Sequence, residues 1–325
     1  MIKKLTKEQK RSLFKQKYNF EDRNAFVFCY IMIGLPLAFF CLFWVYTNIS
    51  SIMLAFKDPQ GNYTLENFVT VFNAFKDKDM YGWNLTDILG RTVHIWFWIY
   101  VFCVLPGMFS SYILYKKMLG HYVFRVIFMI PSILGGIVWT MIMKALVDVG
   151  GPIVTVIERF GVEIPLDVQT NGLLYSSKTA WPTIMLINII PHLVGFNMII
   201  TGAYARIPEQ LFEVGRLEGF KFISEFFHVA VPLVWQTVVV CMISNFAVMF
   251  TYHGDVFLYS KGTNDTGTMG FYLYYLTWQL AGSADTMNAF YGYPAAIGVT
   301  LTFMTIPIVL FGKYVLERAF PPVEY

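Results

Sequence analysis

The stretch Ala205–Pro232, ARIPEQLFEVGRLEGFKFISEFFHVAVP, is a polar segment between two long apolar segments of a largely hydrophobic chain. It carries four acidic residues, three basic residues and one His, whereas the segments on either side are almost uncharged. A stretch this polar does not cross a bilayer, because ionised side chains are costly in hydrocarbon. It is also regularly patterned, so we expect a structured loop between two spanning helices.

The composition predicts a membrane protein with several spans. Of the 325 residues, 56% are hydrophobic and 14% are charged, whereas soluble domains carry about 25% charge. The four cysteines lie inside apolar runs and form no CxxC pair, so neither a disulfide framework nor a metal site is indicated. The basic N-terminal segment and the long first apolar run favour a retained transmembrane anchor over a cleaved signal peptide.

Six segments are long enough to cross a membrane, since a spanning helix needs roughly 20 apolar residues. The predicted spans are Phe26–Leu54, Thr92–Leu114, Val126–Met143, Pro182–Tyr204, Leu233–Tyr252 and Pro294–Phe311. The fold class is therefore all-α, a polytopic membrane protein with six transmembrane helices. We divide the chain into an N-terminal segment of residues 1–25, a six-helix domain of residues 26–318 and a tail of residues 319–325.

The distribution of Lys and Arg predicts the orientation, because cytoplasmic loops carry an excess of these residues. With the N-terminus inside, 16 of the 24 basic residues fall on the cytoplasmic side. Both termini and the loop 205–232 are then cytoplasmic. One of the three long outer segments holds an aromatic run, which favours a helix at the membrane interface over a sugar-stacking surface: Phe271, Tyr272, Tyr274, Tyr275 and Trp278.

The sequence lacks the residues and motifs that ion-coupled transporters, ATP-binding proteins and enzymes need. No Asp, Glu, Lys or Arg lies inside the predicted spans, whereas ion-coupled transporters need ionisable groups at membrane depth. His94 and His192 are the only titratable candidates there, and helix packing explains them more simply than a proton relay. The chain has no GxxxxGK[ST] phosphate loop, no HExxH and no GxSxG, so we expect no ATP site, no metal site and no catalysis within it.

The predicted spans contain a few uncharged polar residues. Interhelical hydrogen bonding is the simpler explanation for them. The functional alternative is a path for a neutral polar solute such as a carbohydrate, which needs hydrogen bonds but no counter-ion. The pathway candidates are Asn188, Asn197 and Asn245.

The loop 205–232 itself predicts two short helices. Pro208 suits a first helical turn, and Gly219 suits a helix end. An apolar stripe recurs between them at spacings of three and four, formed by Ile207, Leu211, Val214 and Leu217. Pro232 is expected to open the next span. A passive helix on lipid headgroups is the alternative, but such helices favour Lys and Arg, whereas this one is rich in acids.

At these residues the chain resembles the permease subunits of binding-protein-dependent ABC importers, in the carbohydrate branch with the maltose and glycerol-phosphate permeases. The loop motif of that family reads E-A-A, three residues, G, about nine residues and a final I-x-L-P. Glu213 takes the Glu position, Gly219 the Gly position and Pro232 the end. Val214 and Gly215 replace the two alanines. Glu218 and Phe220 also depart from the usual Asp and small residue.

The resemblance implies a type I ABC importer permease architecture and a coupling helix seated in a groove of a separate ATPase. By that resemblance Glu213 supplies an anchoring charge and Gly219 a hinge. The expected contact residues are Leu211, Glu213, Val214, Gly215, Leu217, Glu218, Gly219 and Pro232. The expected partners are a second permease subunit, ABC ATPase subunits that bind the ATP, an extracellular solute-binding protein and membrane lipid, with no nucleic acid.

The sequence therefore predicts a permease subunit in the bacterial plasma membrane that takes up a neutral solute, a mono- or oligosaccharide, and is not itself an enzyme. An ion-coupled secondary transporter or a channel for a polar solute is the alternative. A membrane-embedded enzyme lacks any catalytic constellation. A permease of the same class that exports, or that serves amino acids or metals, is less favoured by the carbohydrate-type matches.

Overall fold

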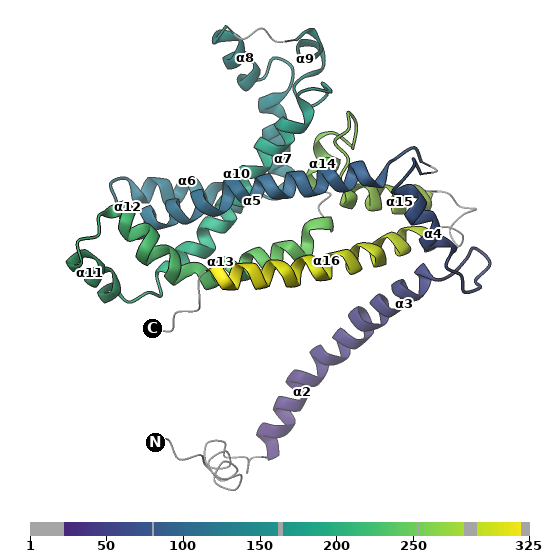
Figure 1. Ribbon diagram of the computed structural model, residues 1–325, viewed down its shortest axis with the longest axis horizontal. Helices are drawn as coiled ribbons and strands as arrows, with labels where there is room; N and C mark the ends of the chain where they lie inside the picture. Colours follow the sequence, from purple (N-terminus) through teal and green to yellow (C-terminus); the bar gives the residue numbers. More distant parts are fainter. Residues whose placement is uncertain (1–22, 80, 162–164, 252–253, 283–290, 320–325) are drawn as a thin grey trace.

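The computed structural model describes residues 23–79, 81–161, 165–251, 254–282 and 291–319, so the predicted N-terminal segment and tail lie almost entirely outside it. The described residues form helices and no β-strand, which confirms the all-α class. Four long helices run along the long axis of the molecule and form a bundle (Figure 1): α5 (Leu85–Tyr115), α10 (Ala180–Tyr204), α13 (Val231–Val248) and α16 (Gly292–Ala319). α5 packs along α10, and α13 packs against α16.

The described residues contain six helical segments that are long and apolar enough to cross a membrane, as predicted. These segments are Val27–Ala55, Leu85–Tyr115, Gly136–Arg159, Ala180–Tyr204, Phe222–Thr251 and Gly292–Arg318. Most helices extend beyond the predicted apolar core and so include charges near their ends, such as Asp87, Arg91 and Lys313.

The third span differs from the prediction Val126–Met143. The backbone is extended at Leu134 and Gly135, so this stretch is split into α6 (His121–Ile133) and α7 (Gly136–Val147). Pro131 and two adjacent glycines weaken the helix at this point. α7 turns away from the bundle with α8 (Pro152–Arg159) and α9 (Leu166–Asn171) as a projecting arm (Figure 1).

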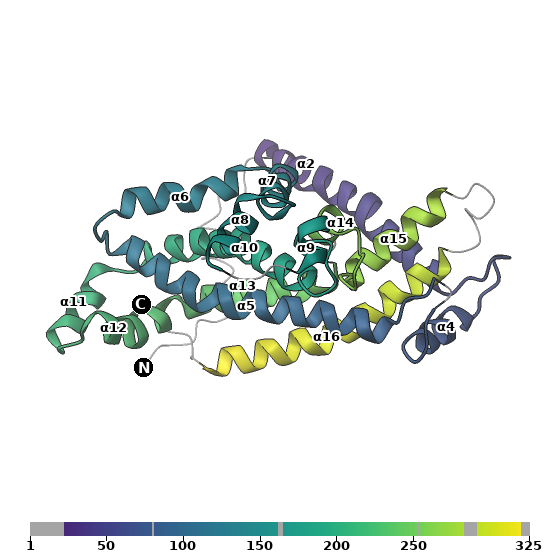
Figure 2. The same ribbon diagram turned by 90° about the horizontal axis from the view of Figure 1, so that it is seen from above.

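The first span leaves the bundle as a rod made of α2 (Arg23–Phe39), the π-helical turn η1 (Phe40–Val45) and α3 (Tyr46–Ala55). The side chains of residues 27–54 are exposed apart from half-buried Val45. The rod meets the bundle at its end, where α3 packs against α16. Figure 1 shows the rod diverging from the other helices, and in Figure 2, seen from above, the rod passes behind them.

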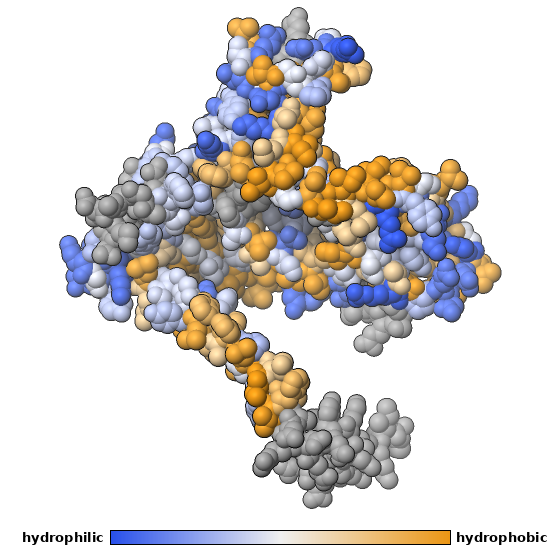
Figure 3. Space-filling model, turned by 180° about the vertical axis from the view of Figure 1, so that it is seen from behind, coloured by the Kyte–Doolittle hydropathy of each residue, from blue (hydrophilic) through white to orange (hydrophobic). Residues whose placement is uncertain are grey.

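The surface divides by polarity along the long axis. Figure 3 shows hydrophilic side chains at the two ends of the molecule and at the tip of the arm, with apolar side chains over the rod and over α6 and α7. This banding is what a bilayer requires of a spanning protein. We call the end that carries α11 (Glu209–Leu217) and α12 (Phe222–Glu225) the loop end and the opposite one the far end.

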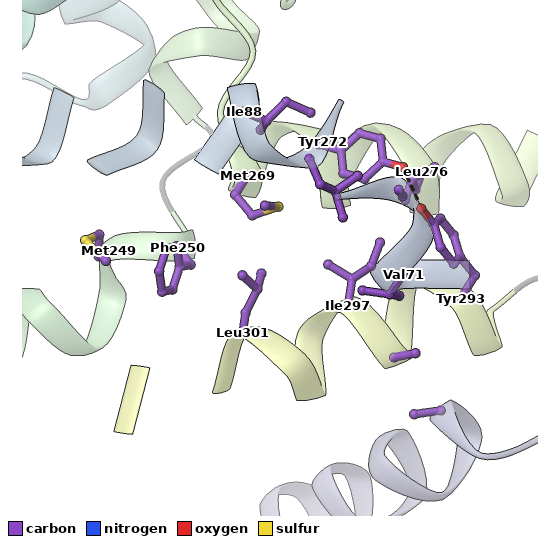
Figure 4. Close-up of a cluster of buried hydrophobic side chains, with 14 residues drawn as sticks. Val71, Ile88, Met249, Phe250, Met269, Tyr272, Leu276, Tyr293, Ile297 and Leu301 are labelled. Atoms are coloured by element: carbon purple, nitrogen blue, oxygen red, sulfur yellow. Dashed lines mark hydrogen bonds between the residues drawn. The ribbon is translucent and has the colours of Figure 1, made fainter. Parts of the chain in front are cut away.

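A buried core closes the far end, where α4 (Glu66–Ala74) and α15 (Met269–Gly282) meet α5 and α16 (Figure 4). The predicted aromatic run lies on α15. Tyr272 belongs to this core, Phe271 is buried with its ring 6.4 Å from that of Trp83, and Trp278 is exposed. The run is therefore helical, as expected, but two of its five residues are buried.

A polar network ties a far-end loop to this core. Asp79 Oδ1 accepts hydrogen bonds from the backbone N–H groups of Tyr81 and Trp83 at 3.0 and 2.8 Å. Its Oδ2 accepts from the hydroxyl of Tyr272, which also lies 3.3 Å from the Tyr293 hydroxyl (Figure 4 shows the two tyrosines). Burial, and then the hydrogen bond to Asp79, raise the pKa of Tyr272, so the phenol remains a donor.

We expect Tyr272→Phe to destabilise the far end, because it leaves one oxygen of a half-buried carboxylate without its donor. A hydrogen bond to a charged group is worth about 1.5–3 kcal/mol, which corresponds to a fall in Tm of roughly 2–5 °C. Thermal unfolding of the detergent-purified chain measures this. Tyr275→Phe on the same helix is the matched control, and an equal Tm for both variants would contradict the network's role.

Candidate functional site

The loop 205–232 begins with one well-defined helix. Pro208 is the N-cap residue of α11, and Glu209 places a carboxylate in the first turn, where the helix dipole favours it. The helix ends at Leu217, and Gly219, two residues further on, has a left-handed φ of +86°. The Gly219 N–H donates to the Arg216 carbonyl at 3.0 Å and the Phe220 N–H to the Gly215 carbonyl at 3.1 Å. This is a Schellman end, for which glycine is the favoured residue.

The second predicted short helix is instead the beginning of the fifth span. α12 continues through the π-helical turn η2 (Phe226–Ala230) into α13, so that one apolar helical segment runs from Phe222 to Thr251. Pro232 lies in the first turn of α13 and does not open the span. A wider turn tolerates proline because it relieves the contact with the preceding carbonyls.

The faces of α11 differ from the predicted apolar stripe. Ile207 is buried beneath the helix, and Leu211 is half-buried against the same cluster. Val214 and Leu217 are exposed, with 51% and 88% of their surface accessible. Phe212, which is 1% exposed, instead packs α11 against the bundle, and it was not part of the predicted apolar stripe.

Gly215 lies at a close contact between α11 and η2. A Cβ atom at this position would come within 3.2 Å of Val229 Cγ2 and 3.4 Å of the Phe220 ring. The glycine therefore lets the two segments approach closely, and this contact accounts physically for a glycine where the loop motif that the sequence resembles has an alanine. Gly215 faces the bundle, so in this chain it is buried and not part of the exposed surface.

An ion pair fastens the loop to α5. Lys116, directly after α5, donates through Nζ to Glu225 Oε1, and Arg216 Nε lies 3.7 Å from Glu225 Oε2. We call Lys116, Arg216 and Glu225 the loop anchor. Lys116 is one of the 16 basic residues that predict the orientation, but no local pattern joins it to Glu225, which lies 109 positions further along.

A cavity of about 700 Å³ opens beside the anchor at the loop end. It lies between α11, the end of α5 and the start of α6. Glu213 is exposed on α11 and lines this cavity together with Glu209 and Arg216. The carboxylate of Glu213 is thus accessible from outside the chain, and its role as an anchoring charge stays a prediction.

A second cavity of about 530 Å³ lies among α5, α10 and α13. Of the three pathway candidates, Asn245 lines it, and its side-chain amide donates to the Cys241 carbonyl at 2.8 Å. Other polar groups on the wall come from Tyr100, His192 and Ser244, and no Asp, Glu, Lys or Arg is among the residues that line it.

The other two pathway candidates are buried among the helices. Asn188 donates to the Ile184 carbonyl at 2.8 Å, and Asn197 donates across to Ser110 Oγ on α5 at 2.6 Å. Both are 2% exposed. Neither lines the second cavity. Asn197 makes the interhelical hydrogen bond that was the simpler alternative, whereas Asn188 bonds within its own helix, and a pathway role for both stays a prediction. In the part of the chain that the structure describes, no group of His, Cys, Asp or Glu could hold a metal ion.

Comparisons with known proteins point to one class of transporter. No family model matches the chain. It is 22% identical to the maltodextrin transport system permease protein MdxF of Bacillus subtilis over an alignment of 267 residues that covers 75% of this chain and 56% of that protein. It is 22% identical to the probable ABC transporter permease protein YurN of the same species, covering 76% and 79%. The chain thus spans about half the length of MdxF but most of YurN.

The fold is shared with a solved structure. The chain resembles a bacterial ABC transporter involved in the import of the acidic polysaccharide alginate, with a TM-score of 0.73 at 16% identity, covering 92% of this chain and 98% of that one. A second structure of bacterial alginate ABC transporter, in complex with an alginate pentasaccharide-bound periplasmic protein, matches equally well at 0.73.

The fold is therefore that of an ABC importer permease, in a multi-pass bacterial membrane protein. In sequence, the chain is similar to permease proteins of a maltodextrin transport system and of a probable ABC transporter.

We expect Gly219→Ala to destabilise the chain by about 1–2 kcal/mol, because a Cβ atom is unfavourable at a left-handed φ. The Tm of the purified chain measures this. Gly202→Ala in α10 is the matched control, since nothing lies within 4 Å of its added Cβ and its φ is ordinary. A Gly219→Ala protein as stable as the control would contradict a conformational role for this glycine.

Proposed function

We propose that this chain is a permease subunit of an ATP-driven importer that takes up a neutral mono- or oligosaccharide delivered by an extracellular binding protein. The observation that carries the proposal is the loop 205–232. It is a helix with an ordered Schellman end, and it is packed on the bundle through Phe212 while it presents Val214 and Leu217 outward. Exposed apolar side chains beside accessible charges suit a protein partner.

That partner is an ABC ATPase on a separate chain, which binds the ATP. With the loop and both termini cytoplasmic, the exposed residues Glu213, Val214 and Leu217 of α11 face the ATPase. On the opposite face of α11, Phe212 and Gly215 pack against the bundle. The membrane portion is completed by a second permease subunit and by lipid. Closure of the ATPases then shifts the bundle between two states, because nucleotide favours one of them.

The second cavity suits a neutral sugar. Its volume of about 530 Å³ lies within the range of small-molecule sites, roughly 300–1,000 Å³. Its wall offers hydroxyl, amide and imidazole groups and aromatic surface, and it contains no Asp, Glu, Lys or Arg. Such a wall matches an uncharged ligand that is rich in hydroxyl groups and needs no counter-ion from the protein. Asn245 is the pathway residue that the cavity favours. The similar alginate transporter imports an acidic polysaccharide, so a neutral substrate would distinguish the two.

Reconstitution tests the proposal. The chain is co-expressed with a second permease subunit, an ABC ATPase and a solute-binding protein encoded in the same genome. The complex is placed in liposomes loaded with ATP and exposed to a mixture of neutral and acidic oligosaccharides. We expect neutral sugars to accumulate inside only with ATP, as read by mass spectrometry of the lumen. Glu213→Lys and Gly219→Pro should each lower this uptake by about tenfold or more.

Uptake that persists without ATP and collapses with an uncoupler would support an ion-coupled transporter instead. Accumulation of acidic oligosaccharides alone would contradict the neutral substrate but leave the ATP-driven class intact. Unchanged uptake in both loop variants would contradict the coupling role of the loop. Glu317→Gln, which alters an exposed carboxylate near the end of α16, controls for a general effect of charge.

A further inference from the structure

The ion pair between Lys116 and Glu225 differs in burial from the others in the described residues. Its two side chains are 12% and 5% exposed. The pair Arg91–Asp265 is 23% and 90% exposed, and Lys313–Glu317 is 52% and 48% exposed. Surface pairs of the latter kind contribute little to stability. A nearly buried pair has given up its hydration, so its geometry has to be well maintained.

The surroundings of Lys116 maintain that geometry. Its Nζ lies 4.4 Å from the centre of the Phe212 ring and 5.4 Å from that of Tyr112. Cations are attracted to aromatic faces at such distances. The ring of Tyr112 also lies 5.1 Å from Phe222 and 5.4 Å from Phe226, which flank Glu225. The ion pair and the rings therefore hold α11 and α12 against the end of α5.

The anchor adds a connection that the chain path does not provide. The loop 205–232 is covalently joined to α10 and α13 only, whereas Lys116 follows directly on α5. α5 has 31 residues and so extends for about 46 Å. At its far end the Thr92 hydroxyl accepts a hydrogen bond from the Met269 N–H at 2.9 Å, at the start of α15. α5 is one continuous helix, with Pro106 inside it, and so connects the anchor with the far end.

We infer that Glu225 is a positioning residue for transport: bound by Lys116 and Arg216, it transmits movement of the ATPase-docked loop to α5. This inference rests on the proposed function and deepens it. Glu225 does not touch the solute or the ATPase; it acts through Lys116. An apolar side chain could fill the same space, but it would not tie the loop to one register on α5.

The test compares solute moved with ATP hydrolysed in the reconstituted complex described above, with the mixed oligosaccharides as probe. Glu225→Gln keeps the size of the side chain and can still accept from Lys116, but it removes the charge. We expect the complex to assemble and hydrolyse ATP, with uptake per ATP lowered about tenfold. Glu317→Gln, which removes a carboxylate from an exposed pair, should leave this ratio unchanged.

A double-variant cycle separates a pair from two independent residues. Lys116→Gln alone should lower the ratio as Glu225→Gln does. The two changes together should cost no more than the worse single change, because both act on one contact. Losses that multiply would overturn the inference. So would a Glu225→Gln complex with the wild-type ratio.

Two further results keep the test decisive. If Glu225→Gln reduces assembly, Glu225→Asp is used instead, because it keeps the charge and shortens the side chain by one methylene. We expect Glu225→Asp to give an intermediate ratio of uptake to ATP hydrolysed, and an unchanged ratio would overturn the inference. Tm values and co-purification of the ATPase report on folding separately. Absence of ATP-driven uptake in the wild-type complex contradicts the proposed function itself, whereas normal wild-type uptake with an unaffected Glu225→Gln contradicts only the role of the anchor.

Discussion

The close packing of α5 along α10 is the interaction on which the rest of the structure depends. Gly107 on α5 faces Phe196, and a Cβ atom there would fall 2.6 Å from the Phe196 ring. Next to it, Ser111 Oγ donates to the Asn197 carbonyl at 3.0 Å. Small residues and hydroxyls of this kind drive helix association where hydrocarbon removes the usual hydrophobic gain. The second cavity lies between these two helices and α13, the anchor joins the end of α5 to the loop that follows α10, and α5 also contributes Leu85 and Ile88 to the far-end core.

The architecture was largely predictable because the bilayer leaves few choices. A chain in hydrocarbon must satisfy its backbone within each segment, so long apolar runs become helices. This rule predicts the six spans and identifies the polar loop between two of them. The third span was misplaced because a local break at Leu134 and Gly135 is stronger than the hydropathy around it. The start of the fifth was missed because a π-helical turn carries the helix past Pro232.

The loop was predictable only where its conformation is local. Gly219 could be identified because a left-handed residue is nearly always glycine after a helix. The faces of α11 could not, since Phe212 and Val214 are both apolar and only the bundle decides which one is buried. The contact of Lys116 with Glu225 joins segments 109 positions apart and has no signal in one sequence. Asn197 and Asn245 looked alike in sequence, yet one joins two helices and the other lines a cavity.

The rod of α2, η1 and α3 also bears on how the chain is made. Its side chains touch almost nothing else in the described residues, so it gains little from the later helices. Insertion of such a segment is governed by its own hydrophobicity. It can therefore enter the bilayer as soon as it leaves the ribosome, before its partners exist. The bundle helices, which share buried side chains, reach their final packing only after the last of them has been synthesised.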